Sequence, residues 1–160
     1  MTEIETKQDY DELLQLVSFN LDEEEFGVDI LKVREINKML QITRVPNSPH
    51  YVEGVINLRG RIIPVVDLRA KVGLKKKSYN NNTRIIVVEI ADKTIGFIVD
   101  KVSEVLRIPK NVTEAPPELI AGIDSDYITA VGKLEDRLLI LLDLNKVFNT
   151  EQIELLGAMN

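Results

Sequence analysis

The chain has 160 residues and carries 20 Lys plus Arg against 26 Asp plus Glu, which gives a formal charge of −6. This charge disfavours a general binder of phosphate backbones, because such a protein needs a concentrated basic face. The sequence contains no Cys, which excludes disulfides, thiolate metal sites and thiol catalysis. It has no secretory apolar region and no apolar run near about 18 residues, so we expect a soluble, cytosolic protein without membrane insertion.

Short runs rich in Val, Ile and Leu dominate the chain and are bounded by Asp, Asn, Gly or Pro, which is typical of strands. A short N-terminal helix is predicted over residues 6–15. Closely spaced strands favour small barrels over alternating β-α-β units. We expect strands at residues 18–21, 27–30, 62–66, 85–90, 95–99 and 138–142.

The chain also repeats itself. Residues 54–68 align without a gap with residues 130–144, at an offset of 130 − 54 = 76. Residues 26–36 align with residues 95–105 when their glycines are superimposed, at an offset of 95 − 26 = 69. The second copy therefore holds 76 − 69 = 7 more residues, most simply within the loop 109–126. Two matches in the same order predict an internal duplication.

The duplication predicts two small bodies within one domain that spans residues 1–160: a first β-barrel repeat at 16–80 and a second at 83–149. A body of this size buries only about 60% of its unfolded surface and is marginal alone. We therefore expect the two halves to share an apolar interface and to unfold together. A strand of one half can complete the barrel of the other.

Three segments outside the strands need separate treatment. Residues 33–40 place apolar side chains at helical spacing, but the matching residues 102–108 have strand composition, so helix and strand stay open with the strand favoured. Thr150 is expected to cap a C-terminal helix over 150–160, whose acidic first turn suits its positive end. The Lys- and Asn-rich residues 75–82 are expected to form a solvated linker.

The sequence is poor in catalytic chemistry. His50 is the single histidine, and no cluster stands at metal-ligand spacing. Asp124 and Asp126 are better explained as turn formers than as calcium ligands. Asp67 and Asp143 end equivalent strands and are expected to accept turn or cap hydrogen bonds; an acid pair between the copies stays open, although nothing places a substrate there. We predict no enzyme, no cofactor and no metal.

The two copies differ most at one turn. Asn57-Leu58-Arg59-Gly60 in the first copy becomes Lys133-Leu134-Glu135-Asp136 in the second, so duplication of a framework does not explain it. Glu35 and Arg59 are single charges among apolar neighbours, and such charges are usually paired. One hypothesis is a structural ion pair between them, and the other is that either charge contacts a partner. Both hypotheses can hold, and function is to be sought here first.

Several long, ordered stretches resemble the CheW family of bacterial chemotaxis coupling proteins. The most specific is a Val-Pro-x-x-Pro spacing at residues 45–49 followed by Gly-Val-Ile-Asn-Leu-Arg-Gly-x-Ile-Ile-Pro-Val-Val-Asp-Leu at 54–68. The resemblance covers nearly the whole chain, and its further segments are residues 19–21, 26–30, 33–36, 42–44, 96–100 and 138–148.

This resemblance implies an all-β fold of two packed SH3-like five-stranded β-barrels, with few short helices. It implies a non-catalytic adaptor that joins methyl-accepting chemoreceptors to the histidine kinase CheA and so controls the activity of the kinase. Such an adaptor is a monomer alone, is cytoplasmic, and is recruited to membrane-associated receptor arrays. There it alternates with the regulatory domain of the kinase around rings, one barrel of each facing the opposite barrel of the other.

The same resemblance implies two binding surfaces, one of which is an apolar groove between the barrels that accepts the helical tip of the receptor. For this receptor side we predict Val28, Ile30, Val33, Glu35, Ile36, Asn57, Arg59, Val99 and Val102. For the kinase side we predict Ile42, Val45, Pro46, Pro49, Val52 and Arg61.

Three alternatives are weighed against this adaptor. The first is the same module in another polypeptide, either the regulatory domain of a kinase or a coupling protein fused to a receiver domain. The chain shows no phosphotransfer histidine, ATP-binding site or receiver acidic cluster, so a stand-alone adaptor is preferred unless the chain is a fragment of such a kinase or fusion. A small β-barrel that binds nucleic acid needs basic and stacking side chains, but aromatics make up only 5%. An enzyme of unidentified type is third.

Overall fold

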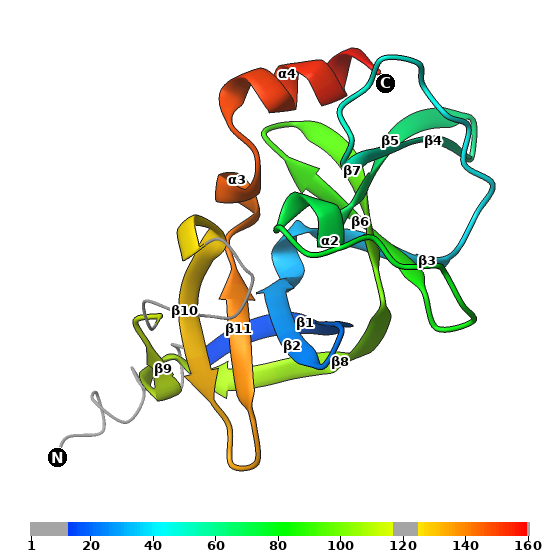
Figure 1. The fold of residues 1–160 in the computed structure, drawn as a ribbon. Helices are drawn as coiled ribbons and strands as arrows, with labels where there is room; N and C mark the ends of the chain where they lie inside the picture. Colours follow the sequence, from blue (N-terminus) through cyan, green and yellow to red (C-terminus); the bar gives the residue numbers. More distant parts are fainter. Residues whose placement is uncertain (1–12, 117–124, 160) are drawn as a thin grey trace, which may run out of the picture.

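The computed structural model describes residues 13–116 and 125–159, which fold mainly into strands joined by short helices (Figure 1). The strands are β1 (Leu13–Leu21), β2 (Glu24–Asp29), β3 (Val33–Lys38), β4 (Val52–Leu58), β5 (Arg61–Asp67), β6 (Arg84–Ile90), β7 (Lys93–Val99), β8 (Lys101–Pro109), β9 (Thr113–Glu114), β10 (Ile128–Lys133) and β11 (Leu138–Leu142). The helices are η1 (Ile30–Lys32), α2 (Leu68–Lys71), η2 (Lys110–Val112), η3 (Ser125–Tyr127), α3 (Leu144–Val147) and α4 (Thr150–Ala158).

The strands form two sheets. One has six strands in the order β8-β1-β2-β11-β10-β9, and the other has five in the order β3-β6-β7-β5-β4. In Figure 1 the six-stranded sheet occupies the lower part of the molecule and the five-stranded sheet the upper right. The predicted all-β class with few short helices is confirmed. Two details differ, because one sheet has a sixth strand and neither sheet forms a closed barrel within the described residues.

Each half of the chain lends a hairpin to the other. The β1–β2 hairpin of the first half pairs with β8 and β11 of the second. The β6–β7 hairpin of the second half pairs in turn with β3 and β5 of the first. Every sheet therefore contains residues from both repeats.

The registers of these exchanged hairpins follow the offsets found in the sequence. Gly27 of β2 lies beside Leu141 of β11 in a parallel pairing, and Gly96 of β7 lies beside Val65 of β5 in the same way. The glycines differ by 96 − 27 = 69 and their partners by 141 − 65 = 76. The two sheets are thus built on one repeated plan, as the duplication predicts.

Burial is organised into one large shared core and two smaller ones. The shared core takes buried residues from both sheets, including Phe19, Phe26 and Phe97. The smaller cores lie within single sheets, one around Ile85 in the five-stranded sheet and one around Leu139 in the six-stranded sheet. The expected apolar interface between the halves is therefore present, and removing one half would expose the largest hydrophobic cluster to water.

The five-stranded sheet is drawn together beyond the end of β3. Thr43 and Val55 exchange two backbone hydrogen bonds, Thr43 N to Val55 O at 2.9 Å and Val55 N to Thr43 O at 2.8 Å. This bridge ties the segment after β3 to β4 at the other edge of the sheet. The second half uses the same device, because Glu114 of β9 pairs with Val131, the counterpart of Val55.

Several local predictions are settled by these elements. Residues 33–38 form strand β3 and not a helix. The helix predicted over 6–15 is wrong at its described end, since residues 13–15 belong to β1; residues 6–12 lie outside the described part. A strand wins there because Leu13 to Pro109 and Gln15 to Arg107 complete the ladder between β1 and β8.

The helix ends follow the sequence closely. Asp67 accepts a hydrogen bond from Ala70 N at the start of α2, and Asp143 accepts one from Asn145 N at the start of α3, which confirms their predicted role as caps. The C-terminal helix begins at Thr150, but its cap is Asn149, which forms a reciprocal capping box with Gln152. The prediction of Thr150 as the cap is wrong, because the Asn149 side chain already accepts the hydrogen bond from the free backbone amide of Gln152.

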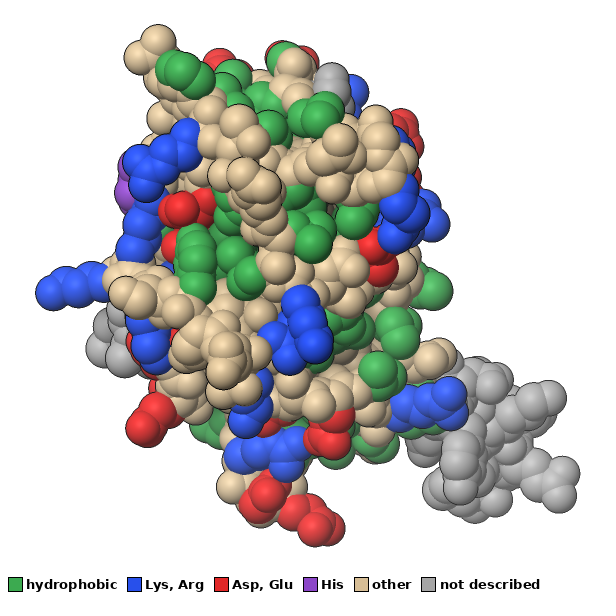
Figure 2. All heavy atoms as spheres, turned by 90° about the vertical axis from the view of Figure 1, so that its right-hand side faces the viewer, with side chains coloured by type: hydrophobic (Ala, Val, Ile, Leu, Met, Phe, Trp, Pro, Cys, Tyr) green, Lys and Arg blue, Asp and Glu red, His purple; other side chains and the backbone are tan. Residues whose placement is uncertain are grey.

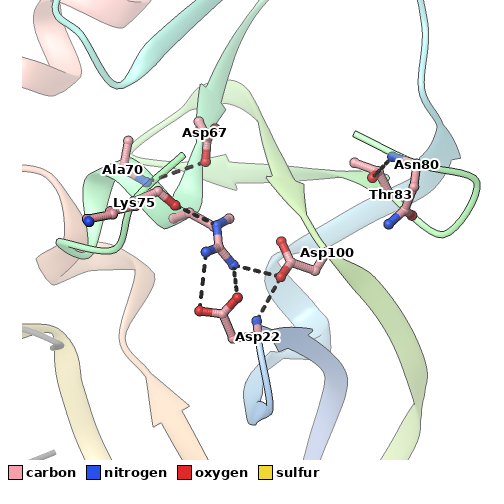
Figure 3. Close-up of polar contacts among 8 residues, drawn as sticks. Asp22, Asp67, Ala70, Lys75, Asn80, Thr83 and Asp100 are labelled. Carbon is pink, nitrogen blue, oxygen red and sulfur yellow. Dashed lines mark hydrogen bonds and ion pairs between the residues drawn. The ribbon is translucent and has the colours of Figure 1, made fainter. Parts of the chain in front are cut away.

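A buried arginine links the two sheets. Arg69 of α2 is 7% exposed, and its Nη1 lies 2.7 Å from Asp22 Oδ1 and 2.8 Å from Asp100 Oδ2. Its Nε donates to the Lys75 carbonyl at 2.8 Å, and Asp100 also accepts from the Asp22 backbone amide (Figure 3). These contacts hold the β1–β2 turn against α2 and the start of the linker.

Candidate functional site

The turn that distinguishes the two halves has an unusual backbone. Arg59 and Gly60 join β4 to β5 with φ angles of 51° and 84°, the left-handed conformation that suits a two-residue hairpin turn. Asn57 Oδ1 accepts the Gly60 amide at 2.8 Å and fixes the turn. Their counterparts Glu135 and Asp136 have no positive φ, so this conformation belongs to the first half alone.

Arg59 forms an ion pair with Glu35 of β3. The Glu35 carboxylate also accepts from Asn37 Nδ2 at 2.8 Å. The hydrogen bond from Arg59, and then the one from Asn37, lower the pKa of Glu35 below its usual range. The Arg59 side chain is nevertheless 72% exposed. The predicted structural pair is thus present, but it is a surface pair that leaves Arg59 accessible to a partner.

This ion pair borders a broad, shallow hollow of about 550 Å³. Arg34 and Glu89, on adjacent strands of its lining, form an ion pair, and Arg61 Nη2 lies 3.2 Å from Thr94 Oγ1. Lining residues are Arg34, Glu35, Leu58, Arg59, Arg61, Ile63, Val87, Glu89 and Thr94. Three guanidiniums beside a few apolar side chains are suited to recognising a partner's polar side chains, and the described residues hold no carboxylate–histidine cluster that would bind a metal.

The predicted receptor-side residues divide by burial. Val28 and Val99 are 2% and 0% exposed and belong to the shared core, around a void of only about 10 Å³. The apolar strands predicted to line an open groove therefore pack on one another there. Ile30, Val33 and Val102 are partly buried against that core. The remaining four reach the surface: Glu35, Ile36, Asn57 and Arg59.

Four of the predicted kinase-side residues lie together. Val45, Pro49 and Val52 line a groove of about 220 Å³, and Pro46 is exposed beside them in the same loop. The Ser48 hydroxyl donates to the Val45 carbonyl at 2.8 Å and holds this loop. Val52 is 6% exposed and forms the base of the groove.

The other two kinase-side residues lie elsewhere. Ile42 packs against the small core of the five-stranded sheet. Arg61 lies in the hollow with Arg59 and Glu35, so the structure groups it with residues predicted for the receptor. The position of Arg61 in the sequence did not reveal that its side chain would lie in the hollow and not in the groove of Val45 and Pro49.

Exposed apolar side chains occur on or next to the strands that carry Glu35 and Arg61. Leu31, next to β3, is 85% exposed, and Ile36 and Ile62 are 40% and 42% exposed. On the face seen in Figure 2, hydrophobic side chains gather in the upper half and charged ones border them. Mixed surfaces of this kind are typical of protein contacts, where apolar anchors are surrounded by polar groups.

Three polar residues of the hollow were not predicted. Arg34 and Glu89 form their ion pair between adjacent strands β3 and β6, a pairing that became visible only with the exchanged hairpin. Thr94 was missed although the repeat held a signal: it stands 94 − 25 = 69 residues after Glu25, at the offset of the upstream match.

Comparison with known proteins now adds to this geometry. A family model described as a CheW-like domain matches residues 15–152. The chain belongs to the CheW-like family. It is 40% identical to Chemotaxis protein CheW of Klebsiella aerogenes over 88% of this chain and 85% of that protein. It is 33% identical to Chemotaxis protein CheW of Treponema pallidum, over 93% and 90% of the two chains.

A solved CheW structure supports the fold directly. The scaffolding protein TtCheW of Thermoanaerobacter tengcongensis superimposes with a TM-score of 0.78 at 40% identity, covering 86% of this chain and 88% of that one. The CheW-like chain is accordingly a chemotaxis protein of the scaffold and adaptor type. No helix among the described residues is both long and apolar enough to cross a membrane.

Proposed function

We propose that this CheW-like chain is a non-catalytic adaptor that couples methyl-accepting chemoreceptors to the histidine kinase CheA. It binds the cytoplasmic tip of the receptor and the regulatory domain of the kinase, and so controls kinase activity. It acts in the cytoplasm, at membrane-associated receptor arrays. Support comes from a family match that spans both halves and from the two separate surfaces around the five-stranded sheet.

The observation that carries this proposal is the Arg59 turn. A non-glycine residue in the left-handed region costs on the order of 1 kcal/mol, and such strain is concentrated at functional sites. A glycine would adopt this turn at a lower cost in free energy, but it would lack the guanidinium that pairs with Glu35. The presence of Arg59 at this position therefore points to a role for its side chain.

The receptor surface that follows from burial is smaller than the sequence predicted. We assign to it Glu35, Ile36, Asn57 and Arg59, with Ile30, Val33 and Val102 supporting them from the edge of the core. Val28 and Val99 are left out because they are core residues. A helical receptor tip would place apolar side chains on Ile36 and polar ones on the Arg59–Glu35 pair.

The kinase surface is assigned to the groove of Val45, Pro46, Pro49 and Val52. Val52 begins β4, and Asn57 lies near the end of the same strand. At roughly 3.3 Å per residue, Val52 and Asn57 are about 17 Å apart along one strand. One copy can thus hold two partners at once, and the unlike ends allow head-to-tail contacts that close into rings with the kinase.

No reaction at the adaptor is needed for signalling by this route. A receptor that changes state shifts the kinase equilibrium if its contacts with the adaptor differ in strength between the two states. Differences of 1–3 kcal/mol are typical of such coupling. Contacts made by one exposed arginine and a few apolar side chains have this size.

A reconstituted assay with receptor, kinase and adaptor tests the proposal. We expect Arg59→Ala to keep a cooperative fold and to lower receptor-dependent kinase activation by about fivefold or more. Arg107→Ala, an exposed arginine on the edge strand β8, is the matched control and should activate like the native chain. Full activation by Arg59→Ala would remove the receptor-site assignment, and failure of the native chain to bind either partner would overturn the adaptor itself.

A further inference from the structure

The repeat places an arginine at the same point of both halves, at positions 61 and 137. In the second half Arg137 is fully engaged. Its Nε lies 2.6 Å from Glu25, its Nη1 2.9 Å from Asp136 and its Nη2 3.1 Å from Glu104. Three carboxylates supplied by the chain itself therefore surround this guanidinium, and its pKa is raised, first by the hydrogen bond to Glu25.

In the first half, none of these carboxylates is available to Arg61. The counterpart of Glu25 is Thr94, and that of Asp136 is Gly60, at 136 − 60 = 76. The counterpart of Glu104 is Glu35, at 104 − 35 = 69, and Glu35 already pairs with Arg59. Within the described residues, the polar contact found for Arg61 is the one to the Thr94 hydroxyl at 3.2 Å.

The hollow is lined by three arginines but only two carboxylates. Its two carboxylates, Glu35 and Glu89, are matched by Arg59 and Arg34 respectively. Arg61 makes the third positive charge, so the hollow carries 3 − 2 = +1 on a chain whose formal charge is −6. A single carboxylate balances this excess. A doubly charged phosphate would over-neutralise it and would meet two glutamates at the rim.

We propose that Arg61 is the docking point for an aspartate or glutamate side chain of the bound receptor tip. The partner supplies in trans the carboxylate that Glu25 supplies in cis to Arg137. This inference rests on the proposed function and specifies the chemistry of its receptor side. It groups Arg61 with Arg59 and separates it from the groove of Val45 and Pro49, because Arg59 and Arg61 line one hollow. Arginine suits the task, since its planar fork can hold both oxygens of a carboxylate.

Charge variants of the full chain test this contact. A soluble fragment of a methyl-accepting chemoreceptor tip is titrated against the native chain, Arg61→Ala and Arg61→Glu. We expect Kd to rise about threefold to tenfold for Arg61→Ala and more than about tenfold for Arg61→Glu, because reversal adds repulsion to the lost pair. Arg107→Glu makes the same change of total charge on strand β8 and should leave Kd within about twofold.

A second variant transplants the second half's arrangement into the first. Thr94→Glu places a carboxylate at the position of Glu25 and should satisfy Arg61 internally, which weakens binding to the tip fragment although Arg61 is retained. The reciprocal variant Glu25→Thr removes one of the three carboxylates that surround Arg137 in the other half and should not change that binding. Circular dichroism and thermal unfolding confirm that each variant is folded before its Kd is read.

The outcomes separate this inference from the function on which it rests. If the native chain binds neither tip nor kinase domain, the adaptor proposal fails. If the native chain binds the tip and Arg61→Glu binds it equally well, only the role of Arg61 fails. Loss of binding to the kinase regulatory domain with unchanged binding to the tip would also overturn the inference. Recovery of Arg61→Glu binding by a tip whose acidic residue is changed to lysine would establish the pair.

Discussion

The α-carbon of Gly54 lies directly against the backbone of Thr43. A β-carbon built at Gly54 would be 2.1 Å from the Thr43 carbonyl oxygen. The φ angle of Gly54 is 149°, a value that residues with a side chain rarely adopt. The close approach permits the two hydrogen bonds between Thr43 and Val55 that draw the five-stranded sheet together. At the equivalent position of the second half the chain carries Ala130.

We therefore expect Gly54→Ala to destabilise the protein by about 3 kcal/mol or more, because a backbone oxygen cannot yield as a side chain can. Urea unfolding measures this loss. Ala130→Gly is the matched control and should cost about 1 kcal/mol or less. Equal effects of the two changes would show that the bridge to Thr43 contributes little to stability.

Replacing Arg59 with glycine separates stability from function. Glycine relieves the left-handed strain at this position, so Arg59→Gly should raise the free energy of unfolding by about 1 kcal/mol while receptor coupling is lost. Ala91→Gly is the control, because Ala91 has a φ of 48° in the β6–β7 turn and faces no proposed partner. It should gain stability and keep coupling. A less stable Arg59→Gly protein would contradict the strain argument.

The buried Arg69 is expected to govern how firmly the sheets are joined. Arg69→Ala removes the guanidinium that Asp22, Asp100 and the Lys75 carbonyl share and should cost about 2–3 kcal/mol. Chemical denaturation followed by circular dichroism measures the cost, and hydrogen exchange near the β1–β2 turn should increase. A change confined to α2, with that turn still protected, would argue against a link between sheets.

The acid response of this junction follows from Asp22. The hydrogen bond from Arg69 lowers the pKa of Asp22 below its usual value. A depressed folded-state pKa adds stability above the unfolded pKa, and that stability is lost as pH falls through the folded pKa. Asp22→Asn should therefore remove part of the loss of stability between neutral pH and about pH 3. The effect is modest because the Asp22 side chain is 47% exposed. If the denaturation midpoints of Asp22→Asn and of the native chain fell equally steeply across that range, the pairing of Asp22 with Arg69 would be contradicted.

Asp67 is expected to behave in the opposite sense. Burial raises the pKa of its carboxyl, so the folded state holds the proton more tightly than the unfolded one. That contribution is present below the unfolded pKa and is lost as pH rises through the folded pKa. Asp67→Asn, which keeps the cap to Ala70, should gain stability relative to the native chain as pH rises, whereas Asp67→Ala should lose about 1 kcal/mol. Stability curves that run parallel over pH for Asp67→Asn and the native chain would exclude this effect.

The repeat made part of the fold predictable. It indicated equivalent strands in the two halves and the caps Asp67 and Asp143, because repeated spacing reports repeated backbone geometry. It did not show which half each hairpin joins. The alternation of apolar residues also cannot tell a strand that lines a groove from one that fills a core, which is why Val28 and Val99 were placed on a surface.

The candidate site was predictable only in part. The turn at Arg59 was found because the second half does not reproduce it, and its partner Glu35 because both charges stand among apolar residues. Arg61 was predicted with the kinase-side residues, but it lies in the hollow with Arg59 and Glu35. A sequence does not say which side chains meet at the end of a sheet. Arg69 was missed because a lone arginine after a strand has no pattern that marks it as buried.

The exchanged hairpins bear on how such a chain could have arisen. A protein made of one half alone would lack β11 beside β2, or β5 beside β7, unless a second molecule provided it. The smallest complete unit with these pairings is therefore a two-fold dimer of single repeats, each donating its hairpin to its neighbour. Fusing the two genes would fix the pairing and free each copy to diverge, leaving an arginine-rich end and an acid-rich end on one polypeptide. A symmetric dimer would carry two identical ends, whereas the fused chain has a direction.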